Sequence, residues 1–186
     1  EFRANLLNDK PRHLAVLSKV ADEAKWSDPL PAGRGRGISL QESFGSIVAQ
    51  VVEVTVTNGK ISVDRVVAAI DPGLAVAPDG LAAQIESGII YGLTAAMYGE
   101  ISIEEGAVVQ GNFNDYESIR MDDSPVIETH IINSGHDIGG AGEPGTPGIA
   151  PAVANAVFDA TGIRVRLLPL NNFDLNYLVE EEGVAG

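Results

Sequence analysis

One glycine-rich segment holds the residues whose types and spacing point most directly to chemistry. Residues 139–147 read Gly-Gly-Ala-Gly-Glu-Pro-Gly-Thr-Pro and stand directly ahead of a predicted helix. Small residues let a backbone approach a ligand closely, and backbone N–H groups at a helix N-terminus favour an anion. Glu143 is the single carboxylate of this segment, and Pro144 restrains the backbone beside it. In partly apolar surroundings such a carboxylate can serve as a general base.

A purely structural explanation of the same segment stays open. A loop that enters a helix uses glycines for its turns, and a glutamate there stabilises the helix dipole without any chemistry. The segment is not a dinucleotide-binding fingerprint, because no suitable strand leads directly into it. It is not a P-loop, because no Gly-Lys-Ser/Thr follows. Spacing alone therefore leaves Glu143 either a base or a loop residue.

The remaining polar candidates form weaker patterns. His130 and His136 lie six residues apart, beside Asp137, but further ligands at helical or hairpin spacing are missing. We therefore expect no metal held by protein ligands. Ser43 and Ser46 have no convincing triad partner and no Gly-x-Ser-x-Gly elbow, so serine hydrolase chemistry is not expected either.

Three further residues have two interpretations each. Gln84 lies on a predicted helix, where a glutamine is either a surface residue or a ligand. Phe113 and Tyr116 either line a pocket or pack at the end of a strand.

Composition excludes several classes of protein. The 186 residues include 26 acidic and 12 basic side chains, a formal net charge of −14, and no cysteine. Disulfide scaffolds, zinc ribbons and cysteine-ligated iron–sulfur clusters are thus absent from this chain. The negative charge argues against binding to nucleic acid or to anionic membranes, since both require clustered Lys and Arg. A hydrophobic content of 45% is sufficient for the core of a globular domain.

The first half of the chain predicts a helix and then a β-hairpin. Apolar residues recur at helical spacing over 11–26, and the Gly/Pro-rich stretch 31–37 predicts a flexible connector. The period then changes to two, and two β-branched runs flank Asn58-Gly59. That dipeptide is typical of a type I′ turn, so the two runs are expected to form an antiparallel hairpin.

The second half predicts helices interspersed with short strands. Apolar residues spaced by four predict a helix over 79–97, with Asp79 as its N-cap and with Gly88 and Gly92 packed closely against a strand. Further predicted elements are strands over 100–103, 107–110, 125–132 and 165–168, and a helix over 150–161 that ends at Gly162. The irregular alternation favours an α+β fold, with a mixed or antiparallel sheet, a β-hairpin and two or three packed helices.

Across residues 3–170, the order of short motifs resembles the molybdenum-cofactor subunits of the xanthine dehydrogenase/aldehyde oxidase family. No single motif is specific, but their shared order is. The motifs lie at 33–38, 42–46, 48–51, 53–54, 69–71, 84–88, 91–93, 112–113, 120–122, 140–147, 150–155 and 164–169.

The resemblance implies site residues and a cofactor. Glu143 matches the glutamate of the family's Gly-x-Gly-Glu-Pro motif, the base that removes a proton from the hydroxyl group that attacks the substrate carbon. Gln84 matches the family's Gln-x-Glu-Gly motif, which hydrogen-bonds the pterin, and Gly140, Ala141 and Gly142 are expected to contact the cofactor. The implied cofactor is molybdopterin cytosine dinucleotide carrying molybdenum, so that the protein supplies no metal ligand. The implied reaction hydroxylates an N-heterocyclic aromatic or oxidises an aldehyde, with water as the oxygen source.

The resemblance also implies partners. Electrons would leave through a [2Fe-2S] small subunit, in agreement with the missing cysteines, and the remainder of the molybdenum subunit would complete the site. A small heteroaromatic or aldehyde substrate is expected, and nucleic acid is not. Three departures from the family pattern concern the pterin pocket: the chain has Asp71-Pro-Gly73 instead of Asp-Cys-Gly, Ala77-Pro78 instead of Asn-Pro, and Ser87 instead of the glycine of Gln-x-Glu-Gly.

We expect residues 1–186 to form a single module, with a helix and linker over 1–35, an α+β core over 36–170 and a polar tail over 171–186. Family subunits are several times longer and residue 1 is Glu, so the chain is expected to be the C-terminal part of such a subunit. We expect it to fold alone, without retaining the cofactor or turning over substrate. The alternative is a stand-alone binding or assembly module with the same fold and no catalysis. The compartment stays open between cytoplasm and periplasm.

Overall fold

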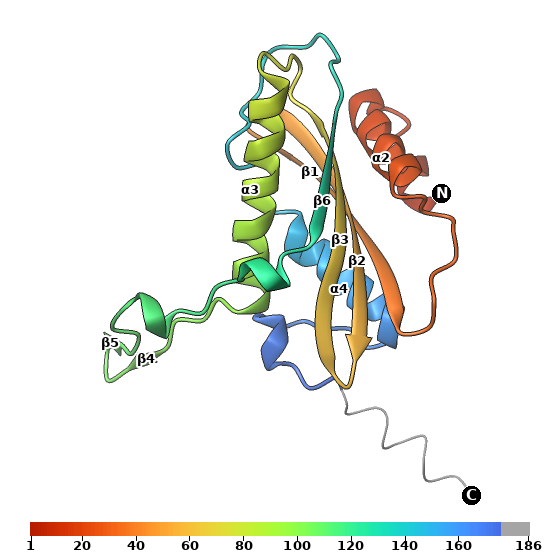
Figure 1. Cartoon of the computed structure of the whole chain (residues 1–186). Helices are drawn as coiled ribbons and strands as arrows, with labels where there is room; N and C mark the ends of the chain where they lie inside the picture. The colour runs from red at the N-terminus through yellow and green to blue at the C-terminus, as the bar shows by residue number, and fades with distance from the viewer. Residues whose placement is uncertain (176–186) are drawn as a thin grey trace, which may run out of the picture.

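A mixed four-stranded sheet with helices on both faces forms the body of the protein (Figure 1). The computed structural model describes residues 1–175. The strand order is β1-β2-β3-β6, in which the first three strands pair antiparallel and β6 pairs parallel to β3. These strands are β1 (Arg34–Ser43), β2 (Ser46–Thr57), β3 (Lys60–Asp71) and β6 (Val126–Ile131). The architecture confirms the predicted α+β class with a mixed sheet and a hairpin.

Two tight turns of the same kind connect the antiparallel strands. Asn58 and Gly59 join β2 to β3 with φ angles of 51° and 74°, which confirms the predicted hairpin. Phe44 and Gly45 join β1 to β2 with φ angles of 55° and 77°. This second hairpin was not predicted, because a phenylalanine rarely takes the left-handed position that asparagine favours.

Helix α2 (Pro11–Glu23) covers one face of the sheet. A short helix α1 (Phe2–Asn5) precedes it in the chain. Val16, Leu17 and Val20 are buried against the sheet residues that point to this face. Proline occupies the first turn of α2, where its missing N–H leaves no hydrogen bond unmade. The helix ends three residues before the predicted boundary at residue 26, and Lys25 follows with a φ of 50°.

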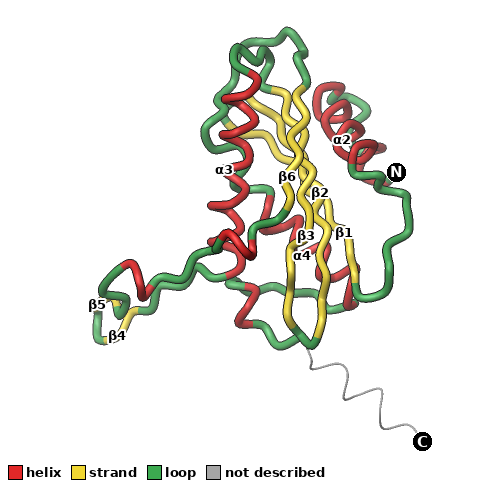
Figure 2. Tube along the Cα trace, in the orientation of Figure 1, coloured by secondary structure: helices red, strands yellow, loops and turns green. Residues whose placement is uncertain are grey.

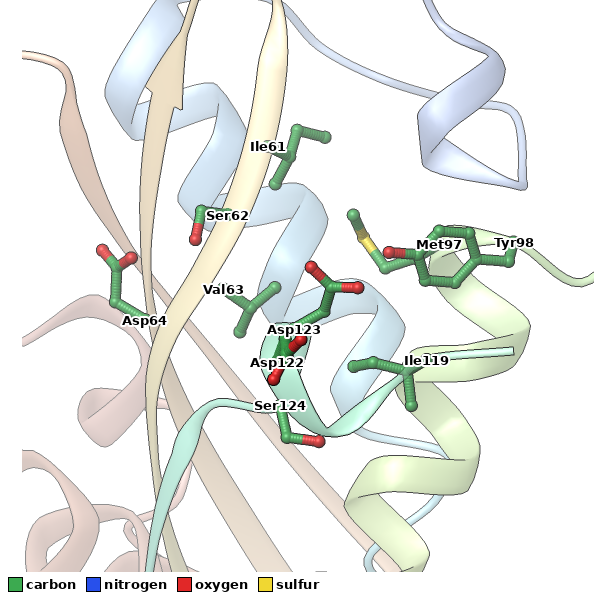
Figure 3. A pocket seen from close by; sticks show the side chains of 10 residues that line it. All are labelled: Ile61, Ser62, Val63, Asp64, Met97, Tyr98, Ile119, Asp122, Asp123 and Ser124. Carbon is green, nitrogen blue, oxygen red and sulfur yellow. The ribbon is translucent and has the colours of Figure 1, made fainter. Parts of the chain in front are cut away.

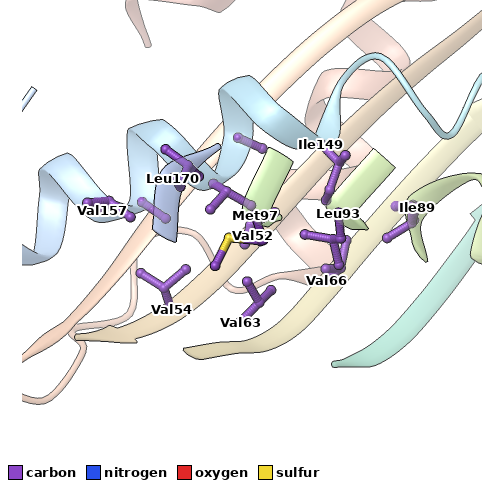
Figure 4. Packing of buried hydrophobic residues seen from close by; sticks show 14 of the residues in the cluster. Val52, Val54, Val63, Val66, Ile89, Leu93, Met97, Ile149, Val157 and Leu170 are labelled. Atoms are coloured by element: carbon purple, nitrogen blue, oxygen red, sulfur yellow. The ribbon is translucent and has the colours of Figure 1, made fainter. Parts of the chain in front are cut away.

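Helices α3 (Pro78–Met97) and α4 (Ile149–Thr161) cover the opposite face and enclose the larger core (Figure 4). The predicted apolar face of α3 is confirmed, and α4 ends at Gly162 with a φ of 74°, as expected. The prediction that Asp79 caps α3 was wrong. Ala77 occupies the cap position and Pro78 begins the helix, so Asp79 lies in the first turn, where its charge favours the helix dipole.

Gly35 and Gly37 let α4 rest directly on the backbone of β1. A Cβ atom on Gly35 would overlap the Ala156 carbonyl oxygen, and one on Gly37 would overlap that of Ala152. The predicted flexible connector over 31–37 is therefore wrong in its second half. Arg34 to Gly37 belong to a strand, and its glycines provide close packing rather than flexibility.

Side chains of α4 also cover the open edge of β1. Asn155 Nδ2 donates to the Ile38 carbonyl at 3.3 Å, and Asp159 Oδ2 accepts from the Arg36 backbone N–H at 2.9 Å. Residues 165–168 pair with no strand of the sheet within the described residues, so the strand predicted there was wrong. The segment instead runs as a loop into the short helix η3 (Leu170–Asn172).

The Arg36 side chain ties the segment between α2 and β1 to the sheet. Its Nε and Nη2 donate to Glu53 Oε1 at 3.0 and 2.7 Å. Its Nη1 donates to the carbonyls of Lys25, Trp26 and Asp28 at 2.9 to 3.1 Å. Arg36 and Glu53 are both buried, and Arg36 is the nearest of three arginines around the Glu53 carboxylate, with Arg34 at 3.5 Å and Arg65 at 3.6 Å.

The chain between α3 and β6 leaves the body as a long arm (Figures 1 and 2). Its strands are shorter than predicted, at β4 (Ile103–Glu104) and β5 (Ala107–Val108), and they pair with each other. Two short helices follow, η1 (Phe113–Asp115) and η2 (Met121–Asp123). Phe113 lies on this arm with 95% of its surface exposed. Residues 1–175 contain no helix long and apolar enough to cross a membrane.

Candidate functional site

The glycine-rich loop spans residues 139–147, and its first residues are fixed to the turn between β1 and β2. The Gly140 N–H donates to the Phe44 carbonyl at 2.7 Å, and Ser46 Oγ donates to the Gly140 carbonyl at 2.6 Å. The Gly139 N–H donates to the Pro72 carbonyl at 2.9 Å. A Cβ on Gly140 would lie 2.8 Å from Phe44 Cβ, so only glycine permits this approach.

Two glutamines of the sheet hold the second half of the loop. Gln41 Nε2 donates to the Pro144 carbonyl, and Gln50 Nε2 donates to the Gly145 carbonyl, both at 2.6 Å. The Thr146 N–H closes a turn by donating to the Glu143 carbonyl at 2.9 Å. The backbone that carries Glu143 is thus fixed on both sides.

Helix α3 packs against the loop from the side opposite to the sheet. A Cβ on Gly88 would lie 3.2 Å from Thr146 Oγ1, and one on Gly145 would lie 2.6 Å from the Ile85 carbonyl oxygen. A Cβ on Gly92 would collide with Ile149 at the start of α4. The close packing predicted for Gly88 and Gly92 therefore occurs against the loop and α4, and the predicted strand partner was wrong.

Glu143 itself projects from this fixed backbone into solvent. Its side chain is exposed and makes no hydrogen bond or ion pair with residues 1–175. Within the same range, the backbone N–H groups of Ala141, Gly142 and Glu143 donate to no acceptor. Nothing lies within 4 Å of the position of a Cβ on Gly142. The loop therefore presents one free carboxylate and a row of free N–H groups.

A hollow of about 360 Å³ beside the loop brings together two of the residues selected from the sequence. Gln84 of α3 and Ala141 of the loop both line it, together with Gly139. Within residues 1–175 the Gln84 amide has no hydrogen-bond partner. The other lining residues are almost all apolar: Pro72, Leu74, Ala75, Val76, Ala77, Gly80, Leu81 and Ile138. Gly140, Gly142 and Glu143 are neighbours of Ala141 along the loop but do not line the hollow.

A second hollow, of about 330 Å³, contains none of those residues (Figure 3). It is lined in part by Asp122 and Asp123, and Tyr98 stands at its side, whereas the carboxylate of Asp64, another lining residue, points away and accepts from Arg34 and Thr55. Burial raises the pKa of the Tyr98 phenol, and the nearby charge of Asp123 raises it further. This acidic hollow lies away from the glycine-rich loop and takes no part in the candidate site.

Asp71 fixes the strand end next to the site. Its carboxylate accepts from Arg12 Nε at 2.7 Å, from Ser134 Oγ at 2.7 Å and from the Gly73 N–H at 2.8 Å. Burial alone would raise the pKa of Asp71. The three hydrogen bonds and the charge of Arg12 outweigh burial and hold that pKa below its ordinary value. This cluster joins α2 to the segment that supplies the Pro72 carbonyl.

The structure separates the other candidates from this site. His130 lies in β6 on the α2 face, 3.7 Å from Glu23, and His136 is exposed. The described part of the chain contains no group of three or more His, Cys, Asp or Glu residues that could hold a metal ion. Phe113 and Tyr116 belong to the arm between α3 and β6 and do not line the hollow beside Gln84.

Sequence reasoning missed the three residues that hold the loop: Gln41, Ser46 and Gln50. One feature of the sequence did point to Gln50, because a glutamine in the middle of a long apolar strand is unusual. In the structure its side chain is completely buried. Its partner lies 95 residues further along the chain, so no local pattern could identify it.

The chain belongs to the molybdopterin cofactor-binding domain family, whose pattern matches residues 19–125. That match includes Gln84 and ends before the loop that carries Glu143.

Individual relatives agree with this family. Isoquinoline 1-oxidoreductase subunit beta of Brevundimonas diminuta is 34% identical over an alignment of 175 residues, which covers 91% of this chain and 22% of the relative. A membrane-bound aldehyde dehydrogenase [pyrroloquinoline-quinone] of Gluconacetobacter polyoxogenes is 31% identical over 88% of this chain and 22% of its own. Among solved structures, the crystal structure of a Cu,Mo-CO dehydrogenase superposes with a TM-score of 0.63 and 25% sequence identity. The superposed region covers 76% of this chain and 19% of the dehydrogenase chain. The chain thus spans about a fifth of the length of these relatives, and the resemblance to the xanthine dehydrogenase/aldehyde oxidase family is confirmed.

Proposed function

We propose that this chain supplies part of the cofactor site of a molybdenum hydroxylase that hydroxylates an N-heterocyclic aromatic or oxidises an aldehyde, with water as the oxygen source. The observation that carries the proposal is the hollow in which Gln84 meets the loop of Glu143. These residues come from separate parts of the chain, and both belong to motifs that match the family.

The residues around the hollow fit a flat heterocycle with hydrogen-bonding edges. The apolar lining contacts the faces of such a group, and the Gln84 amide can both donate and accept at its edge. The free N–H groups of Ala141 and Gly142, with that of Glu143, suit carbonyl or phosphate oxygens. On this basis Gln84 and residues 140–142 would hold a molybdopterin, and the cytosine dinucleotide form is part of the proposal.

In this proposal Glu143 takes up the proton that is released when water-derived oxygen attacks the substrate carbon. A carboxylate on a fixed backbone suits a base, because its distance from the reacting atom changes little between turnovers. The molybdenum cofactor, when bound, supplies the two-electron oxidation of that carbon.

The proposed partners follow from the share of the relatives that this chain spans. The remainder of the molybdenum subunit would cover the exposed side of Glu143 and complete the substrate pocket. A [2Fe-2S] subunit would receive the electrons, since this chain contains no cysteine to ligate a cluster. The substrate is proposed only as a class, a small N-heterocyclic aromatic or an aldehyde.

The test replaces Glu143 by glutamine in the molybdenum enzyme that contains this chain. Turnover per bound molybdenum should fall by at least about 100-fold, because a glutamine cannot take up the proton, while molybdenum content stays unchanged. Glu104→Gln is the matched control, since Glu104 is an exposed glutamate on the arm, and it should leave turnover unchanged. An active Glu143→Gln enzyme would refute the assignment of the base.

A further inference from the structure

We propose that Gln41 and Gln50 are positioning residues for Glu143: they hold the loop backbone so that the Glu143 side chain projects from a fixed Cα position. The inference rests on the proposed function, because it gives the loop a purpose that depends on Glu143 being the base. It concerns two strand residues that touch neither the hollow nor the carboxylate itself.

The contacts of the two glutamines converge on the residues directly after Glu143. Their amide nitrogens donate to two consecutive carbonyls, those of Pro144 and Gly145, each at 2.6 Å. The turn from Glu143 to Thr146 closes over the same two residues. A rotation of the Glu143 backbone would therefore have to break at least one of these hydrogen bonds.

Gln50 is a poor choice if stability alone decides its identity. The residue is completely buried in β2, and its Oε1 has no hydrogen-bond partner in the described part of the chain. A buried carbonyl without a partner destabilises the folded state. An apolar side chain of similar size would avoid that cost, but it would leave the buried Gly145 carbonyl without its donor. The presence of glutamine is therefore explained by the one bond that its Nε2 makes to the loop.

Gly148 shows how closely the two glutamines are packed against the start of α4. A Cβ atom on Gly148 would lie 2.7 Å from Gln41 Oε1, 2.9 Å from Gln50 Oε1 and 2.9 Å from Ser39 Oγ. Any larger residue would displace both amides at once. Gly148→Ala therefore perturbs the same two bonds without changing either glutamine.

The first test uses Gln50→Met, which keeps the size of the side chain but removes both the donor and the unpartnered oxygen. The hydrogen exchange of the Thr146 amide should speed up about fivefold, the factor that corresponds to the loss of one net hydrogen bond. The free energy of unfolding should change little, because the variant removes the unpartnered Gln50 oxygen and at the same time leaves the buried Gly145 carbonyl without its donor. A role in overall stability alone predicts a clear loss of unfolding free energy without a local change in Thr146 exchange.

Matched variants make this measurement specific. Gln110→Met removes a glutamine that bonds within the arm, and it should leave Thr146 exchange unchanged. Gln41→Met and Gly148→Ala should each accelerate Thr146 exchange, and they provide a second and third test if Gln50→Met does not fold. Unchanged Thr146 exchange in folded Gln50→Met protein would overturn the inference.

The second test measures kcat and KM in the molybdenum enzyme, with rates expressed per bound molybdenum. Gln50→Met and Gln41→Met should each lower kcat about 10-fold or more with KM unchanged, because the base is displaced while the hollow is untouched. A loss confined to molybdenum content, with kcat per molybdenum unchanged, would overturn the inference. An active Glu143→Gln enzyme would overturn the proposed function together with this inference, whereas unchanged Thr146 exchange overturns the inference alone.

Discussion

Replacing Gly37 by alanine should destabilise the protein strongly, because α4 lies on the backbone of β1 at this point. A Cβ atom on Gly37 would lie 2.9 Å from the backbone carbon of Asn155 and closer still to Ala152 O and Ala156 N. Carbon contacts sit at roughly 3.5–4.0 Å, so α4 would have to retreat by about 1 Å. The obstructing atoms are helix backbone and cannot rotate away as a side chain would.

The magnitude follows from what that retreat loosens. Ala152, Val153, Ala156 and Val157 of α4 are all fully buried against the sheet or α3. Overpacking of a core destabilises by about 1–3 kcal/mol, and a rigid backbone obstacle places Gly37→Ala near about 3 kcal/mol. For a chain of this size, the melting temperature should then fall by about 6–12 °C.

Urea unfolding followed by far-ultraviolet circular dichroism measures the change, with Gly80→Ala as the matched control. A Cβ on Gly80 would lie 3.8 Å from Ala77 Cβ, an ordinary contact, and the residue belongs to α3. This control should be neutral or gain up to about 1 kcal/mol, because alanine favours a helix over glycine. A Gly37→Ala protein as stable as the parent would refute the packing argument, and so would an equal loss in Gly80→Ala.

Two further predictions concern charged groups. Arg36→Met should lower the free energy of unfolding by about 1.5–3 kcal/mol, because the buried Glu53 carboxylate would lose its two shortest hydrogen bonds and keep only the longer contacts to Arg34 and Arg65. Fluorescence of Trp26, the single tryptophan, reports the loosening of the segment that Arg36 holds, and an unchanged urea midpoint would contradict the prediction. Asp71 has a lowered pKa, so its contribution to stability is present above its ordinary pKa of 3.8 and is lost as the pH falls below it. Between neutral pH and about pH 3, the urea midpoint should therefore fall less steeply in Asp71→Asn than in the parent. The same pH dependence in both proteins would show that the ion pair of Asp71 with Arg12 does not cause this loss of stability.

The elements that periodicity defines were predictable from the sequence. The apolar face at Leu81, Ile85, Ile89 and Leu93 predicted α3, and Asn58-Gly59 predicted the hairpin of β2 and β3. Gly162 correctly marked the end of α4. In each case the physical cause lies within a few residues of the element itself.

The errors share a different cause, because the deciding neighbour is distant in the chain. In the sequence, Gly35 and Gly37 indicate a flexible segment. In the structure they let α4, which lies more than 110 residues later in the chain, pack on the strand. Likewise, the pairing of Gln84 with Ala141 depends on how α3 lies against the loop. The motif that contains Glu143 was predictable, but the side chains that hold its backbone were not.

The arm lengthens the connection that must close before β6 can pair with β3. The parallel pairing of β3 with β6 joins the ends of a 54-residue connection that includes α3 and the whole arm. The entropy of closing a loop grows only with the logarithm of its length, so a connection shorter by the 16 residues 101–116 would differ by about 0.3 kcal/mol. Folding therefore places almost no constraint on the length of this arm, and its length is free to be set by whatever the arm meets outside the body.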